Sequence, residues 1–403
     1  MRDQTTLPVL GDEALLRRVA HVWIALAAAF CAFDLWRKTG VGLTDGNGRP
    51  IGDDFVNYFS GAWLALHQRA SEIYHWPAYH AFQEALVGAS VSPNYNYSYP
   101  PVMLVLAVPF ALLPYVPAFA LWLVGGWYAF FSALRLATPN ALLLALATPA
   151  VFINTYCGQN GVWTAAFLGG GLCLLERRPV IAGVLFGLQA YKPHLALMIP
   201  VALLAGRQWR AIAAAAATVG ALVAASLALA GWDIWRDYVA FLPMLRLITL
   251  EVADGMWHRH ASVFMVVNQM GAGVTAAYAV QAAVGLGSAL LVALAWAKRA
   301  PEPLRNALTL IGALLATPYL QDYDLVLGAF IVAWVMNTEG AARPDVQIAC
   351  ALILLLPLVM APLAKLTGVA FGPLFIIPAL VVTARMIFGA PAPRVAQLSA
   401  SRP

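Results

Sequence analysis

Apolar segments follow one another along this chain with little polar sequence between them. Hydrophobic residues make up 62% of the 403 and charged residues only 11%, whereas a soluble domain usually carries about 25% charged residues. The two longest stretches of polar character, about 37–98 and 231–270, are rich in aromatic residues and are typical of loops between spans. The sequence therefore predicts one all-α polytopic membrane domain over residues 1–403.

The first apolar segment follows Arg17 and Arg18, which predicts a helix that starts on the cytoplasmic side. Asp12 is a suitable N-cap for this helix, and the apolar pattern continues to about residue 36, long enough to cross a bilayer. Near its outer end Asp34 precedes Lys38 by four residues, so we expect these two side chains to pair on one helix face.

The short apolar run at 101–113 decides the predicted topology. If it crosses the membrane, Arg177 and Arg178 fall outside and the later basic clusters are inverted. If it re-enters, 15 of the 24 basic residues and 7 of the 19 acidic residues lie inside, as the positive-inside rule favours. With the first helix, the second arrangement has twelve spans and both termini inside, the later spans lying near 115–135, 139–156, 160–175, 179–192, 194–206, 209–230, 272–297, 304–321, 323–337, 346–363 and 369–388.

The predicted first extracytoplasmic loop, about 39–113, is too long for a simple connector. Within it, apolar residues at helical spacing predict short helices over 55–67 and 76–87, which we expect to lie at the membrane interface. The many tyrosines and tryptophans of this loop suit the headgroup level. A second long extracytoplasmic loop is expected over 231–271.

Two adjacent acids, Asp53 and Asp54, stand immediately before the first of these short helices. A carboxylate is a natural general base for a hydroxyl group, and repulsion between neighbouring carboxylates raises the pKa of one of them. The alternative is that both acids only cap the helix that begins at Phe55.

The predicted topology puts further polar motifs on the same outer face as these acids. Lys192 and Arg259, with the histidines His258 and His260, are suited to hold a phosphate or to neutralise a departing one. Aromatic, amide and acidic side chains from several turns are candidates for lining the substrate path: Tyr58, Trp63, Tyr99, Gln159, Asn160, Gln321, Asp322 and Asp324.

Each of these motifs also has an interpretation without a substrate. Lys192 can extend to the lipid headgroups, and residues 258–260 can form a solvated loop. The pairs at 159–160 and at 322 and 324 can serve as helix caps. Only their common side of the membrane favours a shared site, because polar groups at membrane depth are costly unless they face a cavity.

Two further classes of partner are not expected. The net charge of +5 comes from basic residues at span ends rather than from a basic stripe, which disfavours nucleic acid. No glycine-rich loop for a nucleotide phosphate is present. We expect no metal and no cofactor.

Several short motifs occur in an order that resembles glycosyltransferase family 87, integral membrane enzymes of the GT-C type. They are Asp54-Phe55 with Tyr58, Tyr99-Pro100-Pro101, Gly158-Gln159-Asn160, Lys192-Pro193, Pro318-Tyr319 and Asp322-Tyr323-Asp324. The resemblance runs over about residues 54–335. The family includes the mycobacterial polyprenol-phosphate-mannose-dependent mannosyltransferases. One departure is Gln321-Asp322, where some family members have a histidine.

The resemblance implies a GT-C fold, a polyprenyl-phosphate sugar as co-substrate and a catalytic acid at the position of Asp54. We therefore expect an inverting glycosyltransferase of the inner (plasma) membrane. It moves a sugar, with mannose as one candidate, to a hydroxyl of a lipid or glycan acceptor on the periplasmic face. In this interpretation Asp54 is the base, with Asp53 beside it, and Lys192 and Arg259 hold the phosphate.

Two other functional classes fit the composition. A transporter or flippase of lipid-linked sugars would share the spans and the basic groups, but should carry polar residues along a path through the membrane and often internal repeats. No clear repeat is visible, and the charged motifs are predicted on one side. A lipid-embedded binding or assembly protein gives the acids no role.

Overall fold

The regular structure of the chain is helical throughout the part that is described. The computed structural model describes residues 13–252 and 256–389, and Asp12, the expected cap of the first helix, lies outside them. These residues contain isolated β-bridges but no β-strand. The helices are α2 (Glu13–Arg37), α3 (Phe55–Leu66), α4 (Trp76–Val87), α5 (Val102–Ala111), α6 (Tyr115–Leu134), α7 (Ala141–Ala147), α8 (Pro149–Tyr156), α9 (Gly161–Leu174), α10 (Pro179–Leu188), α11 (Met198–Ala205), α12 (Trp209–Ala230), α13 (Asp233–Arg246), α14 (Val263–Gln269), α15 (Val274–Ala297), α16 (Glu302–Ala316), α17 (Gly328–Met336), α18 (Pro344–Thr367) and α19 (Gly372–Phe388).

Five of the helices in the described ranges are long and apolar enough to cross a membrane: α2, α6, α12, α15 and α18. Several other predicted spans are shorter than expected, and the one at 139–156 is divided into α7 and α8. The break falls at Thr148, which is extended because the following Pro149 disfavours a helical conformation in the residue before it. The membrane class is thus supported, and the twelve-span topology stays a prediction.

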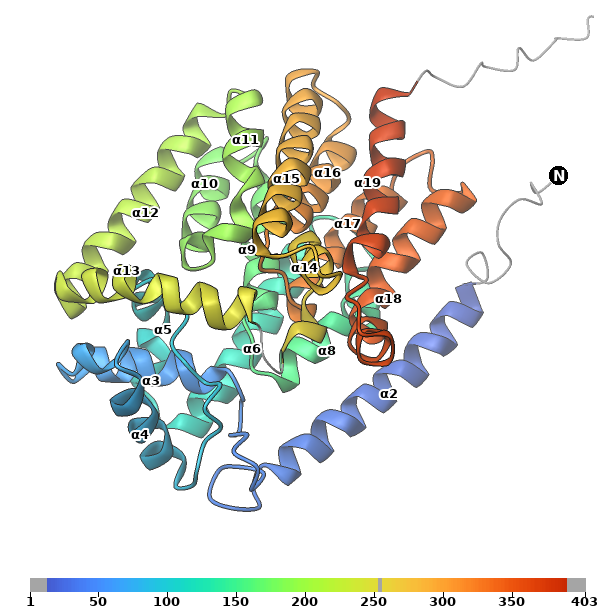
Figure 1. The fold of residues 1–403 in the computed structure, drawn as a ribbon. Coiled ribbons are helices and arrows are strands. Elements are labelled where there is room, and N and C mark those ends of the chain that lie inside the picture. The colour runs from blue at the N-terminus through green and yellow to red at the C-terminus, as the bar shows by residue number, and fades with distance from the viewer. Residues whose placement is uncertain (1–12, 253–255, 390–403) are drawn as a thin grey trace, which may run out of the picture.

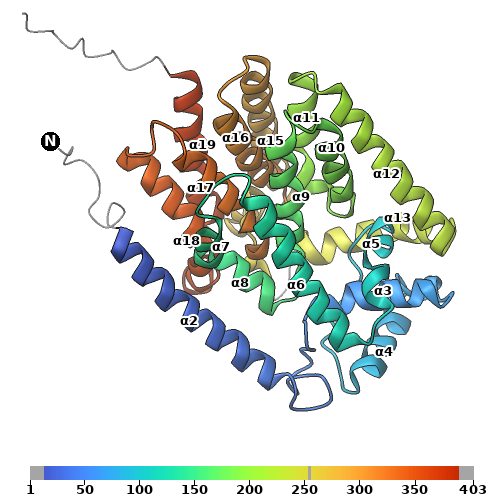
Figure 2. The same cartoon turned by 180° about the vertical axis from the view of Figure 1, so that it is seen from behind.

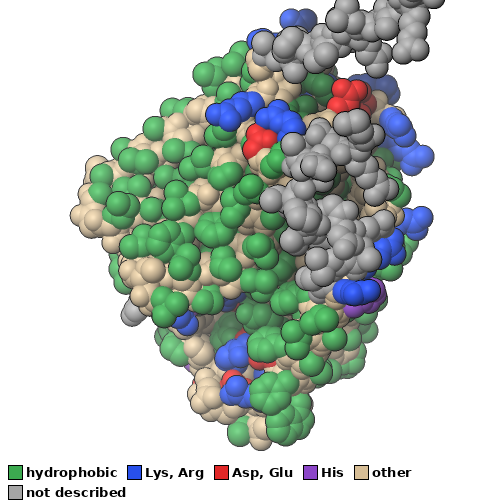
Figure 3. Space-filling view, turned by 90° about the vertical axis from the view of Figure 1, so that its right-hand side faces the viewer, with side chains coloured by type: hydrophobic (Ala, Val, Ile, Leu, Met, Phe, Trp, Pro, Cys, Tyr) green, Lys and Arg blue, Asp and Glu red, His purple; other side chains and the backbone are tan. Residues whose placement is uncertain are grey.

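The helices form an upper bundle and a lower layer (Figures 1 and 2). The bundle contains α10, α11, α12, α15, α16 and α19, and the lower layer contains α3 and α4. Within the bundle α10 packs on α12 and α15 packs on α16, while α2 runs obliquely along the outside. In the face drawn in Figure 3, apolar side chains cover the middle, and Lys and Arg side chains lie above, below and to the right of them.

The helix that follows the two acids is largely covered by other helices, while its place at the membrane interface stays a prediction. Ten of the 12 residues of α3 are buried. It is covered by α5, α12 and α4, so both its apolar face and its polar residues face protein. The other short helix, α4, buries only Tyr79, Gln83 and Val87.

The run at 101–113 forms α5, a helix of 10 residues. Such a helix is about 15 Å long, half of the roughly 30 Å hydrocarbon thickness. A helix of this length does not cross the hydrocarbon region by itself, and the re-entrant course of the run stays a prediction. It packs against α3 and α12.

The expected second long loop, 231–271, is largely helical. It contains α13, a π-helical turn at Leu247–Glu251, and α14. In both ribbon views α13 lies crosswise between α12 and the lower layer. The sequence pattern did not predict this helix, because Asp233, Arg236 and Asp237 give its first turns the polarity of a loop.

Candidate functional site

A cavity of about 480 Å³ lies where the lower layer meets the ends of the bundle helices. Its lining comes from the start of α3, the first loop, the turn before α9, α13 and the segments around residues 260 and 321. Five of the predicted site residues line it together: Asp54, Tyr99, Gln159, His260 and Gln321. Residues up to 267 positions apart along the chain thus meet in one cavity. This is compatible with the prediction that they lie on the same side of the membrane.

Asp54 immediately precedes α3, but it is not a side-chain cap. Its backbone is already helical, with φ −64° and ψ −16°, and its carboxylate makes no capping hydrogen bond. The capping alternative is therefore wrong for this acid. Its backbone N–H donates to the carbonyl oxygen of Cys157 at 3.1 Å, which joins the start of α3 to the turn at 158–160.

Gly158 makes this junction possible. Its φ of +59° lies in the left-handed region that glycine adopts without strain, and a Cβ atom here would lie 2.0 Å from the carbonyl oxygen of Gly52. The two backbones approach so closely that only glycine fits. The contact places Gln159 beside Asp54, and Gln159 donates a hydrogen bond to the carboxylate.

Burial, and secondly the negative charge of Asp53, raise the pKa of Asp54 to about 6. The positive charges of Arg259 and Lys192 and the hydrogen bond from Gln159 act in the opposite direction. A carboxyl group with a pKa near the working pH is suited to accept a proton during a reaction and to release it afterwards.

Asp53 has a different environment from its neighbour. Its carboxylate lies 2.5 Å from Nζ of Lys38, accepts two hydrogen bonds from Arg49 at 2.8 and 3.2 Å, and accepts one from the Tyr95 hydroxyl at 2.7 Å. The expected pairing of Lys38 with Asp34 is confirmed at 2.5 Å, and Arg49 also reaches Asp34. Both carboxylate oxygens of Asp53 therefore have partners within this ion cluster.

The cluster also holds an unusual backbone conformation. Asp53 has φ +40°, which is strained for a residue with a side chain. Its several partners stabilise this conformation, which turns the chain from the first loop into α3. The geometry gives Asp53 a structural role and leaves Asp54 as the acid that faces the cavity.

Aromatic hydroxyls and amides form a connected network next to Asp54. The Tyr58 hydroxyl donates to Oε1 of Gln159 at 2.7 Å and lies 3.1 Å from the Tyr99 hydroxyl. The amide of Asn160 donates to both hydroxyls, at 3.1 and 2.9 Å. Asn160 precedes α9 but makes no side-chain cap. The network orients Gln159, and through it the carboxylate of Asp54.

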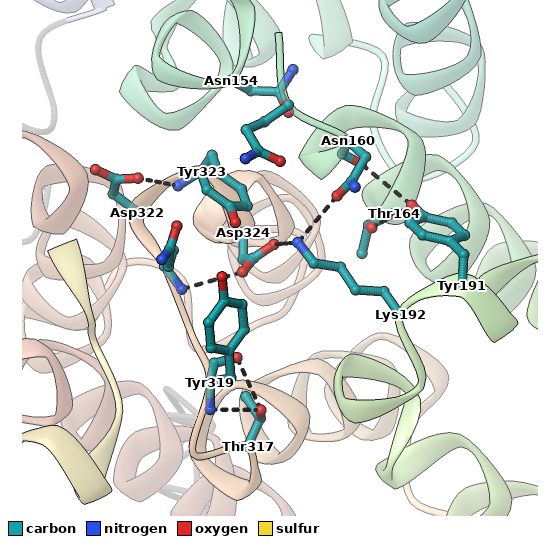
Figure 4. A network of polar contacts seen from close by, with 12 residues as sticks. Asn154, Asn160, Thr164, Tyr191, Lys192, Thr317, Tyr319, Asp322, Tyr323 and Asp324 are labelled. Carbon is teal, nitrogen blue, oxygen red and sulfur yellow. Dashed lines mark hydrogen bonds and ion pairs between the residues drawn. The ribbon is translucent and has the colours of Figure 1, made fainter. Parts of the chain in front are cut away.

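Lys192 is buried, so the alternative that it extends to the headgroups is wrong. Figure 4 shows its ammonium group between two acceptors: Oδ1 of Asp324 at 2.5 Å and Oδ1 of Asn160 at 3.1 Å. It also lies over the ring of Tyr323. The alternative of a capping role for Asp324 is supported, because its carboxylate accepts from the backbone N–H of Gln321 in the capping box of the 3₁₀ helix at Asp322–Leu327.

Arg259 forms a two-bonded pair with Asp322, with Nε and Nη2 each 2.8 Å from a carboxylate oxygen. Both basic groups lie over the ring of Tyr323, which lines the cavity: Nζ of Lys192 is 4.6 Å and Cζ of Arg259 is 5.8 Å from the ring centroid. Both cations are already neutralised by an acid.

The histidines differ from each other. His260 is buried and lines the cavity, and its Nε2 lies 3.3 Å from the amide nitrogen of Gln321, while its Nδ1 has no partner. Burial lowers the pKa of His260 to about 3, so the ring is neutral and presents one N–H. His258 lies outside the cavity, packed edge-on against Trp257.

Trp63 is not brought to the site. Its indole stacks on His67, with ring centroids 3.7 Å apart, and on Phe82, at 4.8 Å, and it lines neither this cavity nor the smaller one described below. Its position in the sequence does not distinguish it from Tyr58, because the sequence does not show which face of α3 is turned toward the cavity.

A second, more apolar cavity of about 260 Å³ adjoins the first. The two share Ser98, Tyr99, Thr249 and Tyr319 in their linings. Lys192 and the side chains of α13 line the second one. Tyr319 and α13 were not predicted from the sequence as parts of the site, although Tyr319 belongs to the Pro318-Tyr319 motif. Tyr319 lines both cavities, a position that depends on tertiary packing.

No group of three or more His, Cys, Asp and Glu side chains within 13–252 and 256–389 is arranged to hold a metal ion.

The chain matches the family model described as glycosyltransferase family 87 over residues 97–318. No curated protein and no solved structure matches the chain. The matched part includes Tyr99, Gln159 and Lys192, while Asp54 lies before it and Gln321 just after it. Because the match covers more than half of its length, the chain belongs to glycosyltransferase family 87, and its activity is the transfer of a glycosyl group.

Proposed function

We propose that this glycosyltransferase moves a sugar from a polyprenyl phosphate to an acceptor hydroxyl with inversion at the anomeric carbon, and that Asp54 is the general base. One observation carries the proposal. Among the described residues that line the larger cavity, Asp54 is the only carboxylate. The neighbouring acids Asp53, Asp322 and Asp324 are each held in an ion pair.

The proposed reaction is a single displacement. The acceptor oxygen forms a bond to the anomeric carbon while its proton moves to the Asp54 carboxylate. The bond from that carbon to the phosphate oxygen breaks, and its electron pair stays on the phosphate. The products are the glycosylated acceptor and a polyprenyl phosphate with one additional negative charge. A base with a raised pKa suits such a proton transfer.

The departing phosphate needs donors and positive potential. Lys192 and Arg259 lie close by within their ion pairs, and His260, whose ring lines the cavity, has a buried Nδ1 without a partner among the described residues. His260 lies against Gln321, the position at which some relatives have a histidine. We propose that His260 takes the place of that residue and donates to the phosphate.

The proposal places the site on the periplasmic face. The turn that carries Arg207, with Arg210 at the start of α12, and the turn that carries Lys298 and Arg299 join α11 to α12 and α15 to α16 at the upper end of the bundle in Figure 1. Asp54 lies at the start of α3, in the lower layer. With the basic turns on the cytoplasmic side, the cavity is at the opposite side.

The deciding experiment compares purified wild type with Asp54→Asn, which keeps the shape of the side chain and removes its basicity. Each is given a polyprenyl-phosphate mannose and a mixture of lipid and saccharide acceptors, and products are identified by mass spectrometry. We expect no product from Asp54→Asn at wild-type levels of folded protein. Transfer at the wild-type rate by this variant would refute Asp54 as the base. If wild type is active only with another donor sugar, mannose is excluded.

A further inference from the structure

The larger cavity changes in character from its depth to its opening. The deep part contains buried side chains, among them Gln159, His260 and Gln321. The exposed side chains of its lining mark the rim: Pro93 and Asn94 of the first loop, with Met244 and Ile248 of α13 and the turn that follows it. The rim is therefore the part that an incoming molecule meets first, and none of its groups belongs to the machinery described above.

Trp76 is the large side chain of this rim. It is the first residue of α4, and one face of its indole is stacked on the ring of His80, with centroids 5.3 Å apart and planes 11° from parallel. The stacking fixes the orientation of the indole. Because Trp76 is only half-buried and lines the cavity, part of its surface remains open to a ligand.

Small polar side chains continue from this indole toward Asp54. Asn94, Asn96, Ser98 and Asn57 all line the cavity. The oxygen of the Asn57 amide is occupied by a hydrogen bond from Gln83 at 2.9 Å, so its NH₂ group is the part left to a ligand. The hydroxyl of Ser98 donates to Asn96, which ties these two side chains to each other.

The second cavity has a different lining. Leu242, Leu245 and Leu250 line it from α13 and the turn that follows, together with Pro318 and the basic side chains of Lys192 and Arg246. The first cavity also has apolar lining from the same segment, in Phe241, Met244 and Ile248, but among the described residues it alone of the two is lined by amide side chains. Amide donors and acceptors are thus concentrated on one side of Tyr99 and Tyr319.

We propose that the part of the larger cavity between Trp76 and Asp54 binds a saccharide portion of the acceptor. A pyranose ring has an apolar C–H face, which packs on an indole, and hydroxyls at its edge, which match amide donors and acceptors. This inference rests on the proposed function and deepens it, since it assigns the attacking hydroxyl to a sugar. The sugar comes from a free oligosaccharide or from a glycolipid headgroup.

Binding to purified protein tests the subsite without turnover. Mannobiose, maltose and cellobiose are used as probes, and their dissociation constants are measured by saturation-transfer NMR for wild type, Trp76→Ala and Trp76→Phe. For the probe that binds best, we expect Trp76→Ala to weaken binding about tenfold and Trp76→Phe to weaken it less. The control is Trp209→Ala, since Trp209 is also the first residue of a helix but lies in α12, outside both cavities. Equal binding by wild type and Trp76→Ala would overturn the assignment.

Transfer assays then distinguish the two sources of the sugar. The acceptors are the best-binding disaccharide, its octyl glycoside, and octanol. We expect both saccharides or the octyl glycoside alone to be glycosylated, with octanol unused, and Trp76→Ala to raise the acceptor KM while the donor KM stays within about twofold. Use of octanol as well as the glycosides would contradict the proposal. Loss of transfer in Asp54→Asn tests the base separately, because saccharide binding is measured in that variant too.

Discussion

The ammonium group of Lys38 lies 2.5 Å from Oδ2 of Asp53, so the end of the first long helix is joined to the residue next to the proposed base. The same group lies 2.5 Å from Asp34 in α2. Lys38 is 1% exposed, so water screens neither contact well. Through this contact α2, which packs along α7 and α8, supports the start of α3.

Replacing Asp53 with Asn should destabilise the protein more than it impairs the chemistry. The change leaves Lys38 and Arg49 facing one acid instead of two, and an uncompensated buried charge costs roughly 3–5 kcal/mol. We expect a clearly lower melting temperature in detergent and a residual transfer rate well above that of Asp54→Asn. The double variant Lys38→Met/Asp53→Asn restores the balance of charge and should recover part of the melting temperature. If Asp53→Asn is as inactive as Asp54→Asn at full stability, Asp53 takes part in the reaction.

The pH profile of transfer should show the ionisation of Asp54. Because the base must be unprotonated and its pKa is raised to about 6, the rate under saturating substrate should rise through pH 6 and level off above it. His260 is not the source of this rise, since burial holds its pKa near 3. Rates measured between pH 4.5 and 8, with thermal stability monitored at each pH, check the expectation. A flat profile over this range would contradict the raised pKa.

The same shift predicts a stability effect of opposite sign. A carboxyl group whose pKa is higher in the folded protein stabilises the fold when protonated. That contribution is complete below the unfolded value of 3.8 and is lost as the pH rises through about 6. Asp54→Asn should therefore be more stable than wild type above pH 6, by roughly 1–3 kcal/mol, and the difference should shrink at pH 4. Melting curves of both proteins at pH 4 and pH 8 measure it.

The pair formed by Lys192 and Asp324 allows a structural role to be separated from phosphate binding. Lys192→Met leaves a buried acid unpaired and should lower stability strongly. Lys192→Met/Asp324→Asn removes both charges and should regain stability. If Lys192 also attracts the donor phosphate, the double variant will keep a donor KM raised by about tenfold or more. Recovery of both stability and donor KM would show that Lys192 serves the fold alone.

The close approach of Gly158 to Gly52 is testable with a matched glycine. Gly158→Ala adds a Cβ that would lie 2.0 Å from a backbone oxygen, whereas Gly271→Ala adds one in open space, although both glycines have positive φ. The cost of positive φ, about 1 kcal/mol, is common to both. We expect Gly158→Ala to lower transfer and melting temperature far more than Gly271→Ala. Similar effects would mean that backbone strain alone explains the change.

Much of the local structure could be predicted from the sequence. Apolar periodicity and end residues predicted helices at 55–67 and 76–87, and the structure has them at Phe55–Leu66 and Trp76–Val87. The pairing of Asp34 with Lys38 followed from helical spacing. Both results depend on interactions within four residues, which a single sequence displays directly.

Burial could not be predicted in the same way. The pattern of α3 predicted the helix itself, but it did not predict that α5 and α12 cover it. A periodic pattern reports which side of a helix is apolar. It does not report whether protein also covers the polar side, because that depends on segments far away in the chain.

For the site, too, some properties follow from the sequence and others only from the tertiary structure. The sequence by itself determined that the chain belongs in a membrane, that its motifs resemble glycosyltransferases, and that Asp53, Asp54, Lys192 and Arg259 are present to react or to bind. Only the tertiary structure decided which of these groups is free. Lys192 meets Asp324 across 132 residues, and Asp53 is taken up by Lys38 and Arg49, so Asp54 alone keeps its carboxylate for the cavity. The physical reason is that charges in a protein interior must find partners, and which partners are within reach is set by packing.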